Sequence, residues 1–489
     1  MSDIKTLVKQ SSHYFFGQAT VLAAGFLSFP ILTRIFSVRD YGLMSLVTTT
    51  LFIAVAIVKF GTPNSIVRFY AEYKATDRLS SFFTTLFLGI SGFAILMGVS
   101  VVFGIQLLKN LFHDKNLVVL LSIVSMLIVT GCLSDMLMSF LRAEQRTKMY
   151  NLFAIIRRYV TLACGIIFAL YLVKGVKGFF LGQLLAGVIV LLALLFVFRK
   201  RLELRRENFS KDVLKTSLLF GFPLVWAEFG HLLLNYIDRY IIQFYLGAGA
   251  LGIYTAGYNL ATHITEALIY PVNYAMTPVY MSILVNRGER DTKIFFTKMF
   301  RYFLLVLLPV VFGSIAVGKD LISVLASKKY LESYDILTYV LLGQAVYACT
   351  IILNSGLFIN KKTHVLNNIM MFTCAINVAF NLLLVPRFGI VGAAQATLIS
   401  YVIYALVVTF FSFKMFSFRI DYRKIFIYAG SALMMFIAVK TVSFGNSLLN
   451  IIGQIITGSV VYILLVVLFD AEIRRKVQLA MAQLRNRHA

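Results

Sequence analysis

Two adjacent arginines, Arg157 and Arg158, stand within the apolar stretch NLFAIIRRYVTLACGIIFAL at residues 151–170. A guanidinium group keeps its charge at physiological pH, and its planar donors can hold two oxygens of a phosphate or carboxylate at once. Other apolar stretches also contain charged residues, namely Arg34, Lys59, Asp135, Glu228, Asp238, Arg239 and Glu266. Charges in such surroundings usually face a polar cavity or a partner, so these positions are candidates for binding.

The stretches that carry these charges are long enough to span a lipid bilayer. Hydrophobic residues make up 60% of the 489 residues and charged residues only 14%. A helix needs about 20 apolar residues to cross ~30 Å of hydrocarbon. Fourteen such stretches are predicted, at residues 12–36, 42–66, 81–108, 117–141, 151–173, 178–198, 214–242, 249–281, 296–317, 335–359, 365–385, 390–412, 425–441 and 448–469. Because they are continuous and do not alternate in polarity, the sequence predicts an all-α integral membrane protein and not a β-barrel.

Lysine and arginine residues are distributed unequally between alternate loops. Counted with Lys215, Lys298, Arg301 and Lys440 near the span ends, the N-terminus, every second loop and the C-terminus together carry 31 of them, and the other loops carry 10. Since positively charged loops remain in the cytoplasm during insertion, both termini are expected to be cytoplasmic. The net charge of +25 therefore reflects topology, and its spread over short loops argues against nucleic-acid binding. The densest basic segment, RKRLELRRENFSK at 199–211, is expected at the anionic inner leaflet as an anchor and linker.

Three pairs of segments match at nearly constant spacing, which indicates an internal duplication. EQRTKMYNL at 144–152 resembles NKKTHVLNN at 360–368 with an offset of 216 residues. The glycines of LVKGVKGFFLGQ and LVPRFGIVGAAQ match at an offset of 214, and those of RDYGLMSL and GALGIYTA at 210. Two six-helix copies in the same orientation, with a cavity between them, are therefore predicted. The expected domains are an N-terminal lobe at 1–198, a basic cytoplasmic linker at 199–213, a C-terminal lobe at 214–412, and two additional helices with a basic cytoplasmic tail at 413–489.

The intramembrane charges have a second explanation that is purely structural. A long side chain near a helix end can reach the membrane interface, which would account for Arg34, Asp238 and Arg239. Adjacent helix positions differ by about 100°, so Arg157 and Arg158 cannot point the same way. One of them is expected to enter the cavity while the other reaches the headgroups or forms an ion pair. Lys59 is expected deep within its predicted span, where a cavity is the better explanation.

The sign of the charges predicts an anionic cargo. In the first copy Arg34, Lys59, Arg157 and Arg158 are accompanied within the predicted spans only by Asp135 as an acid. With Arg239, these four arginines and lysines are the predicted substrate-binding residues, because a cationic lumen suits phosphate and carboxylate groups. The acids Glu228, Asp238 and Glu266 are candidates for coupling to a proton or sodium gradient, with hydrogen bonding between helices as the alternative.

The sequence contains no motif of a known enzyme class. It lacks a P-loop, a GxSxG nucleophile motif and an HExxH zinc motif, and its six histidines show no ligand spacing. Its four cysteines fall within predicted helices without CxxC spacing, which predicts packing residues and neither disulfides nor a metal site. No cofactor is therefore expected, and a membrane-embedded transferase is a less favoured alternative to a transporter.

Several segments together resemble a known family, the polysaccharide flippases of the multidrug/oligosaccharidyl-lipid/polysaccharide exporter superfamily, O-antigen type. The resemblance runs in family order from about residue 10 to 415 and rests on FPILTRIFSVRDYGLMSL, GTPNSIVRFYAEYK, FLRAEQRTKMYNL, NYIDRYIIQFYLGAGALGIYTAGYNLA, PVNYAMTPVYMSIL and FNLLLVPRFGIVGAAQATLIS. It implies two six-helix lobes around a central cavity, often followed by two extra helices, in the MATE-like fold.

The resemblance also implies an activity and a location. Such a protein would move an undecaprenyl-diphosphate-linked oligosaccharide from the cytoplasmic to the outer leaflet of the bacterial inner membrane by alternating access. A polysaccharide polymerase and glycosyltransferases would be its partners. Lipid II or related glycolipids, and drugs exported by cation coupling, are the alternative cargoes. Drug exporters of the superfamily commonly carry an acid in the first helix, and residues 12–36 contain none.

Overall fold

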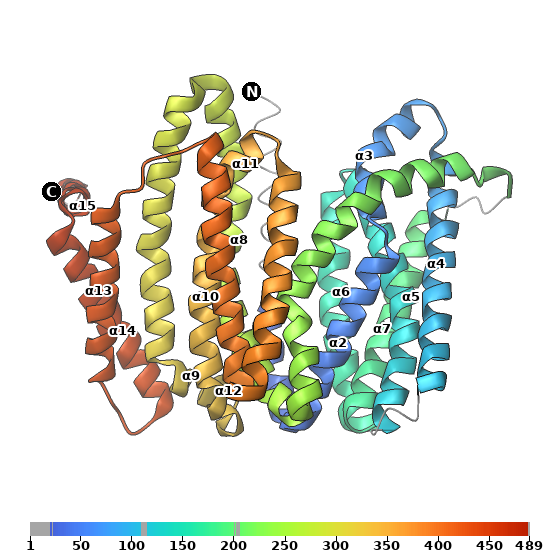
Figure 1. Cartoon of the computed structure of the whole chain (residues 1–489), viewed down its shortest axis with the longest axis horizontal. Coiled ribbons are helices and arrows are strands. Elements are labelled where there is room, and N and C mark those ends of the chain that lie inside the picture. The colour runs from blue at the N-terminus through green and yellow to red at the C-terminus, as the bar shows by residue number, and fades with distance from the viewer. Residues whose placement is uncertain (1–19, 22, 109–114, 200, 202–205, 488–489) are drawn as a thin grey trace. The chain divides into compact units, whose positions relative to one another are not determined.

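The computed structural model describes residues 20–21, 23–108, 115–199, 201 and 206–487, and this part of the chain is built from helices without strands (Figure 1). It packs as two compact units, Met1–Thr255 and Ala256–Ala489. Ten of the described helices are long and apolar enough to cross a membrane, so the predicted all-α membrane fold is confirmed. The first predicted span lies partly outside the described residues, and its described part contains the apolar helix Ala23–Ile35.

Most helices of the first unit correspond to predicted spans, and the predicted span 42–66 is divided between two helices. They are α2 (Val38–Val58), α3 (Thr62–Ala75), α4 (Leu79–Leu108), α5 (Lys115–Ala143), α6 (Thr147–Ile167) with the π-helical turn η1 (Phe168–Leu172), α7 (Val176–Phe198) and the short η2 (Arg206–Asn208). Helix α2 begins where the Ser37 hydroxyl accepts a hydrogen bond from the backbone N–H of Asp40 at 3.1 Å. This side-chain cap satisfies one of the donors left open in the first turn.

Two long helical stretches contain internal turns at glycine. In α8 (Lys211–Ala316), Gly247 and Gly288 have φ of 80° and 82°, and in α12 (Thr363–Met415) Gly389 has φ of 62°. An α-helix requires a negative φ, so α8 consists of three helical segments and α12 of two. Counted in this way, the ten candidate spans become thirteen, and with Ala23–Ile35 the described residues contain fourteen apolar helices, which agrees with the predicted number.

The second unit continues beyond α8 with α9 (Gly318–Leu325), η3 (Lys328–Ser333), α10 (Tyr334–Leu353), α11 (Ser355–Ile359), α12, α13 (Tyr422–Lys440), α14 (Ser447–Phe469) and α15 (Ala471–Arg487). The segment predicted as a basic tail is thus a helix, α15. Both carboxylate oxygens of Glu472 accept hydrogen bonds from Arg301, at 2.7 and 2.8 Å. This fork-shaped contact holds α15 against α8 and lowers the pKa of Glu472 to about 2.

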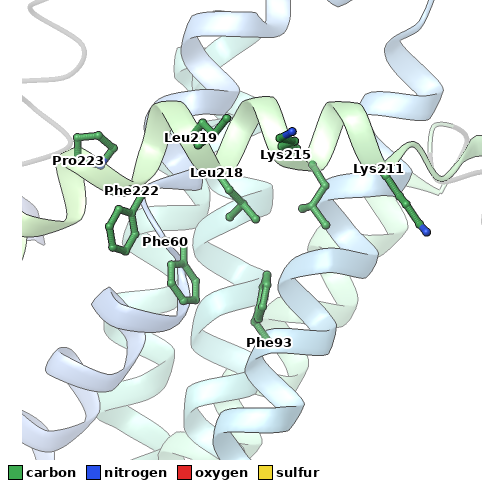
Figure 2. A pocket seen from close by; sticks show the side chains of 9 residues that line it. Phe60, Phe93, Lys211, Lys215, Leu218, Leu219, Phe222 and Pro223 are labelled. Atoms are coloured by element: carbon green, nitrogen blue, oxygen red, sulfur yellow. The ribbon is translucent and has the colours of Figure 1, made fainter.

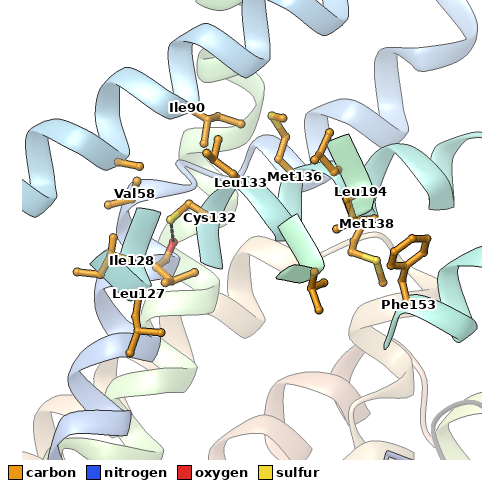
Figure 3. Packing of buried hydrophobic residues seen from close by; sticks show 14 of the residues in the cluster. Val58, Ile90, Leu127, Ile128, Cys132, Leu133, Met136, Met138, Phe153 and Leu194 are labelled. Atoms are coloured by element: carbon orange, nitrogen blue, oxygen red, sulfur yellow. Dashed lines mark hydrogen bonds between the residues drawn. The ribbon is translucent and has the colours of Figure 1, made fainter. Parts of the chain in front are cut away.

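The core of the first unit lies where α5 packs against α4 and α7. Phe82 and Phe83 of α4, Phe140 of α5 and Phe198 of α7 are fully buried there and contact one another. Figure 3 shows the neighbouring part of this cluster, in which the Cys132 thiol points to the backbone carbonyl of Val55, 3.9 Å away. Cys132 is buried and packs as a small residue, as predicted. Close packing of this kind fixes α5, which carries a charged residue of the site described below.

Positions that match in the duplicated segments have matching backbone conformations. Gln145 and Lys361, 216 residues apart, have φ of 57° and 55°, and each precedes by two residues the start of a helix, α6 or α12. The matched glycines Gly175 and Gly389 have φ of 86° and 62°. Side chains rarely adopt such a conformation, so agreement at two separate turns supports the duplication. The domain boundaries given above stay a prediction.

The third matched pair, Gly42 and Gly252, lies in a reciprocal contact between α2 and the second segment of α8. A Cβ added at Gly42 would lie 2.0 Å from the carbonyl oxygen of Ala248, and one added at Gly252 would lie 1.9 Å from that of Val38. Val38 and Ala248 are themselves 210 residues apart, as are Gly42 and Gly252. The contact therefore has the form of a two-fold interface, in which equivalent surfaces of the two matched segments face each other. Glycine, which has no side chain, allows the two backbones to approach closely.

We predict that Gly252→Ala destabilises the protein whereas Gly249→Ala does not. The methyl group of an alanine at position 252 would collide with the backbone carbonyl oxygen of Val38, which cannot rotate away. Such overpacking costs about 1–3 kcal/mol. Gly249 lies on the same segment with nothing within 4 Å of its added Cβ, and alanine favours a helix by about 1 kcal/mol. The apparent melting temperature of the detergent-solubilised variants measures the difference. Equal melting temperatures for the two variants would contradict the close contact.

Candidate functional site

The second predicted span, 42–66, is interrupted by a sharp turn. Helix α2 ends at Val58 with Lys59 as its C-cap, Phe60 and Gly61 have φ of 44° and 66°, and α3 starts at Thr62 with Pro63 in its first turn. Proline has no N–H to donate and its ring clashes with the preceding helical turn, so one helix cannot run through this segment. The prediction of one uninterrupted helix over 42–66 is therefore wrong, and Lys59 caps α2 at the turn.

An ion cluster joins three helices of the first unit beside this turn. Arg157 of α6 donates to the Asp135 carboxylate of α5 at 2.5 Å, and the Lys59 ammonium lies 3.4 Å from the same carboxylate. Lys59 also donates to Glu228 of α8 at 3.4 Å. The side chains of Lys59 and Asp135 are 15% and 27% exposed, while those of Arg157 and Glu228 are 38% and 40% exposed. The four charges compensate one another, which lowers the cost of placing them in a membrane protein.

A cavity of about 400 Å³ opens onto this cluster. Its lining consists of Val21, Lys59, Pro63, Asp135, Met138, Ser139, Arg142, Tyr150, Ala154, Arg157 and Arg158. Four of these side chains are cationic and one is a carboxylate, so the lining carries a formal charge of +3. We refer to this cavity as the cationic pocket. Its charge and its arginine forks suit a group with several anionic oxygens.

The sequence identifies four of the five charged residues of the cationic pocket but misses three of its polar residues, Ser139, Arg142 and Tyr150. Arg142 lies one residue beyond the predicted span 117–141, although it follows Asp135 by seven residues and therefore lies on the same face of α5. Tyr150 precedes Arg157 by seven residues on α6 and shares its face in the same way. Helical spacing from the predicted charges was the signal that could have identified Arg142 and Tyr150.

Arg157 and Arg158 differ in the way that the geometry of a helix predicts. Arg157 forms the ion pair with Asp135 and is half-buried, whereas Arg158 is exposed. Both nevertheless line the cationic pocket. Two adjacent positions on α6 thus provide one arginine that is held by a carboxylate and one on the outer rim.

The other predicted residues, Arg34, Asp238, Arg239 and Glu266, are not among the lining residues of the cationic pocket. Arg34 is exposed at the end of helix Ala23–Ile35 and donates to the backbone carbonyl of Pro30 at 2.9 Å. Asp238 and Arg239 are buried in α8. Arg239 donates to the Thr49 hydroxyl at 3.1 Å, and Asp238 accepts a hydrogen bond from Tyr254. Glu266 is half-buried in the part of α8 that belongs to the second unit.

Residues 7–284 match the family model described as "Polysaccharide biosynthesis protein". The match covers more than half of the chain. The chain belongs to this family. Its curated relatives include an uncharacterised membrane protein in the cps region of Klebsiella pneumoniae, 23% identical over 407 residues, with 81% of this chain and 80% of the relative covered. An uncharacterised membrane protein of Methanocaldococcus jannaschii is 22% identical over 195 residues, which span only 38% of that relative and 40% of this chain.

Solved structures show the same fold in transporters. The inward closed conformation of the lipid II flippase MurJ is similar with a TM-score of 0.77 and 18% identity, covering 95% of this chain and 99% of that one. An inward-facing multidrug resistance MATE family transporter of the MOP superfamily is similar with a TM-score of 0.57 and 16% identity, covering 79% and 96%. This family member is therefore a multi-pass membrane protein, and its fold is that of the MurJ and MATE transporter structures.

We predict that Asp135→Asn and Arg157→Gln destabilise the protein in a non-additive way. Either change alone leaves a charge without its main partner, whereas the double variant removes both, and residues in contact typically show a coupling of about 0.5–3 kcal/mol. Apparent melting temperatures of the single and double variants give the coupling. Arg158→Gln combined with Asp135→Asn is the matched control and should be additive. An additive result for the Arg157 pair would contradict the ion pair.

Proposed function

We propose that this protein is a flippase that moves an undecaprenyl-diphosphate-linked oligosaccharide from the cytoplasmic to the outer leaflet for surface polysaccharide synthesis. The single observation that carries the choice of an anionic cargo is the cationic pocket, with four cationic side chains and one carboxylate on its lining. The membership in a polysaccharide biosynthesis family and the relative from a cps region support a glycan as the remainder of the cargo.

The pocket residues divide into two groups by exposure, which gives an order of binding. Arg142 and Arg158 are exposed, so a diphosphate meets them first. Lys59 and Arg157 lie further in, each already bound to Asp135. A phosphate oxygen then competes with the Asp135 carboxylate for these two cations. The carboxylate thus compensates part of this positive charge before the diphosphate binds, and the diphosphate then takes over part of that role.

Transport of this kind needs no covalent chemistry. The barrier to translocation is the desolvation of the charged and sugar-bearing headgroup across ~30 Å of hydrocarbon. A polar, cationic surface inside the protein replaces water around the diphosphate, while the prenyl chain stays in the lipid. The superfamily fold moves cargo by alternating access, in which the lobes expose such a surface to one side at a time.

Transport in a purified system tests the function directly. Protein reconstituted into liposomes should move a lipid-linked oligosaccharide between leaflets, measured by its accessibility to a glycosidase outside the vesicle, and mass spectrometry should find its mass unchanged. Liposomes with the Arg157→Gln/Arg158→Gln variant are the control. A change in the mass of the lipid would identify a transferase instead. Transport of a cationic drug but of no lipid-linked glycan would identify an exporter.

We predict that Arg158→Ala lowers transport at least tenfold without changing membrane abundance. The exposed guanidinium has no role in the Asp135 ion pair, and losing a charge-assisted contact to a phosphate costs about 1.5–3 kcal/mol. Arg158→Lys should retain an intermediate rate because lysine restores the charge but not the two-oxygen grip. Arg34→Ala, which alters an exposed arginine outside the pocket, is the matched control. The assignment fails if Arg158→Ala transports at the unaltered rate.

Cysteine labelling tests the orientation of the protein in the membrane. Single cysteines at Arg206 and Arg290, in a variant without the four native cysteines, should be protected from an impermeant thiol reagent in intact cells, and one at Lys328 should react. The expectation follows from the excess of basic residues in alternate loops. Permeabilised cells provide the control, because all three sites should then react. Reaction at Arg206 in intact cells would reverse the proposed topology.

A further inference from the structure

The beginning of α8 has the character of a helix that lies in the membrane interface. Its sequence from Lys211 is KDVLKTSLLFGFP, with charged residues at positions 211, 212 and 215 and an apolar run that begins at Leu218. Lys211 and Lys215 are both exposed and one helical turn apart. Figure 1 shows this part of α8 lying across the ends of the other helices of its unit. A basic face beside an apolar one is typical of interfacial helices.

An apolar cavity of about 590 Å³ lies beneath this segment (Figure 2). Its lining residues are Phe60, Phe93, Lys211, Leu214, Lys215, Leu218, Leu219, Phe222 and Pro223. The volume is within the ~300–1,000 Å³ of typical small-molecule sites. Among the described residues, the two lysines are the only charged residues of the lining, and Phe60, Phe222 and Pro223 lie toward the other end of the cavity in Figure 2. We refer to this cavity as the apolar groove.

Contacts on both sides fix the walls of the apolar groove. The Ser65 hydroxyl donates to the backbone carbonyl of Ser217 at 2.6 Å, and a Cβ added at Gly61 would lie 2.1 Å from the carbonyl oxygen of Gly221. Just before α8, the backbone N–H of Ser210 donates to the Thr85 hydroxyl of α4 at 3.0 Å. The start of α8 is thus attached to α3, to the turn after α2 and to α4. The groove between these attachments is a preformed feature.

We propose that the apolar groove binds one acyl chain of an anionic glycerophospholipid of the surrounding leaflet, with the lipid phosphate between Lys211 and Lys215. The ligand must be amphiphilic with a negative head, because the cationic end adjoins an apolar lining. No ion pair within 4.0 Å joins either lysine to a carboxylate of the described residues. The lysines also continue the basic segment 199–211, so the head would lie in the most positive part of this chain.

The bound lipid would support the turn that presents Lys59 to the cationic pocket. Phe60 lines the apolar groove while Lys59 and Pro63 line the cationic pocket, so the two cavities share this turn. The Phe60 ring contacts Phe93 at 5.1 Å and Phe222 at 6.4 Å between ring centres. An acyl chain beside these rings would fill the space into which Phe60 could otherwise move. The lipid site itself is independent of the cargo proposed above.

Contact quenching of tryptophan fluorescence tests this site. Trp226 is the only tryptophan of the chain, so Trp226→Phe with Phe93→Trp places a single reporter in the wall of the groove. The protein is reconstituted in phosphatidylcholine containing phosphatidylglycerol with brominated acyl chains, which quench only on contact. Half-maximal quenching is expected at about a tenfold lower mole fraction of brominated phosphatidylglycerol than of brominated phosphatidylcholine, because two lysines attract the anionic head.

Two double variants decide whether the lysines cause the preference. Lys211→Gln/Lys215→Gln should abolish the tenfold difference. Lys174→Gln/Lys177→Gln removes the same charge from exposed residues outside the groove and should retain it. A retained preference in the first variant, or equal quenching by both lipids in the parent protein, overturns the proposal. If Phe93→Trp in α4 impairs folding, Phe222→Trp places the tryptophan reporter in α8, on the opposite wall of the groove.

Competition separates a phospholipid from the prenyl chain of a cargo. Unbrominated phosphatidylglycerol should relieve the quenching, and undecaprenyl phosphate at the same mole fraction should relieve it at least tenfold less effectively. Equal or stronger relief by undecaprenyl phosphate would assign the groove to a prenyl chain and overturn the phospholipid assignment. Since fluorescence quenching does not depend on transport, this experiment can contradict the lipid site without contradicting the flippase function, and the reverse also holds.

Discussion

The Asp135 carboxylate is the interaction on which the arrangement of the first unit depends. It lies between two cations from different helices, Lys59 at the end of α2 and Arg157 within α6. Each charge alone would cost about 2.5–3.5 kcal/mol in a helix at the membrane centre, and a mutual contact is the means of offsetting that cost. The contact can form only if α2, α5 and α6 take one relative position. The same scaffold could not carry an anionic pocket. Replacing Lys59 and Arg157 by acids would leave Asp135 without the partners that position the three helices.

The turn at residues 59–61 converts this electrostatic constraint into two different surfaces. Lys59 extends to the cationic pocket and Phe60 to the apolar groove, although they are neighbours in the sequence. The turn is fixed by the glycine contact between Gly61 and Gly221 and by the pair of Lys59 with Glu228. All of these partners belong to the first part of α8. A shift of that part would therefore alter both the hydrophobic wall and the position of the charge.

The sequence predicts the fold well because lipid imposes a simple requirement on each helix. Apolar length alone placed fourteen helices, and the turns at Gly247, Gly288 and Gly389 lie in the predicted loops. The interruption after Val58 was missed because the apolar character continues through it, although Gly61 and Pro63 were available signals. Arg142 was missed because it lies just beyond its predicted span. There, the sequence alone does not distinguish an arginine that lines a binding site from one that belongs to a basic loop. The pairing of Asp238 with Tyr254 depends on tertiary packing that no local pattern encodes.

The duplication explains the scaffold but not the charges. At the offsets that align the turns, the positions equivalent to Asp135 and Arg157 are Ile351 and Thr373, and the position equivalent to Lys59 is Ile269. Thr373 is buried, and its hydroxyl donates to a backbone carbonyl of its own helix. It therefore needs no partner from another helix. Two copies with one backbone pattern therefore differ in what they can bind. At these equivalent positions only the first copy carries the ion cluster around Asp135, so the asymmetry between the copies concerns this cluster.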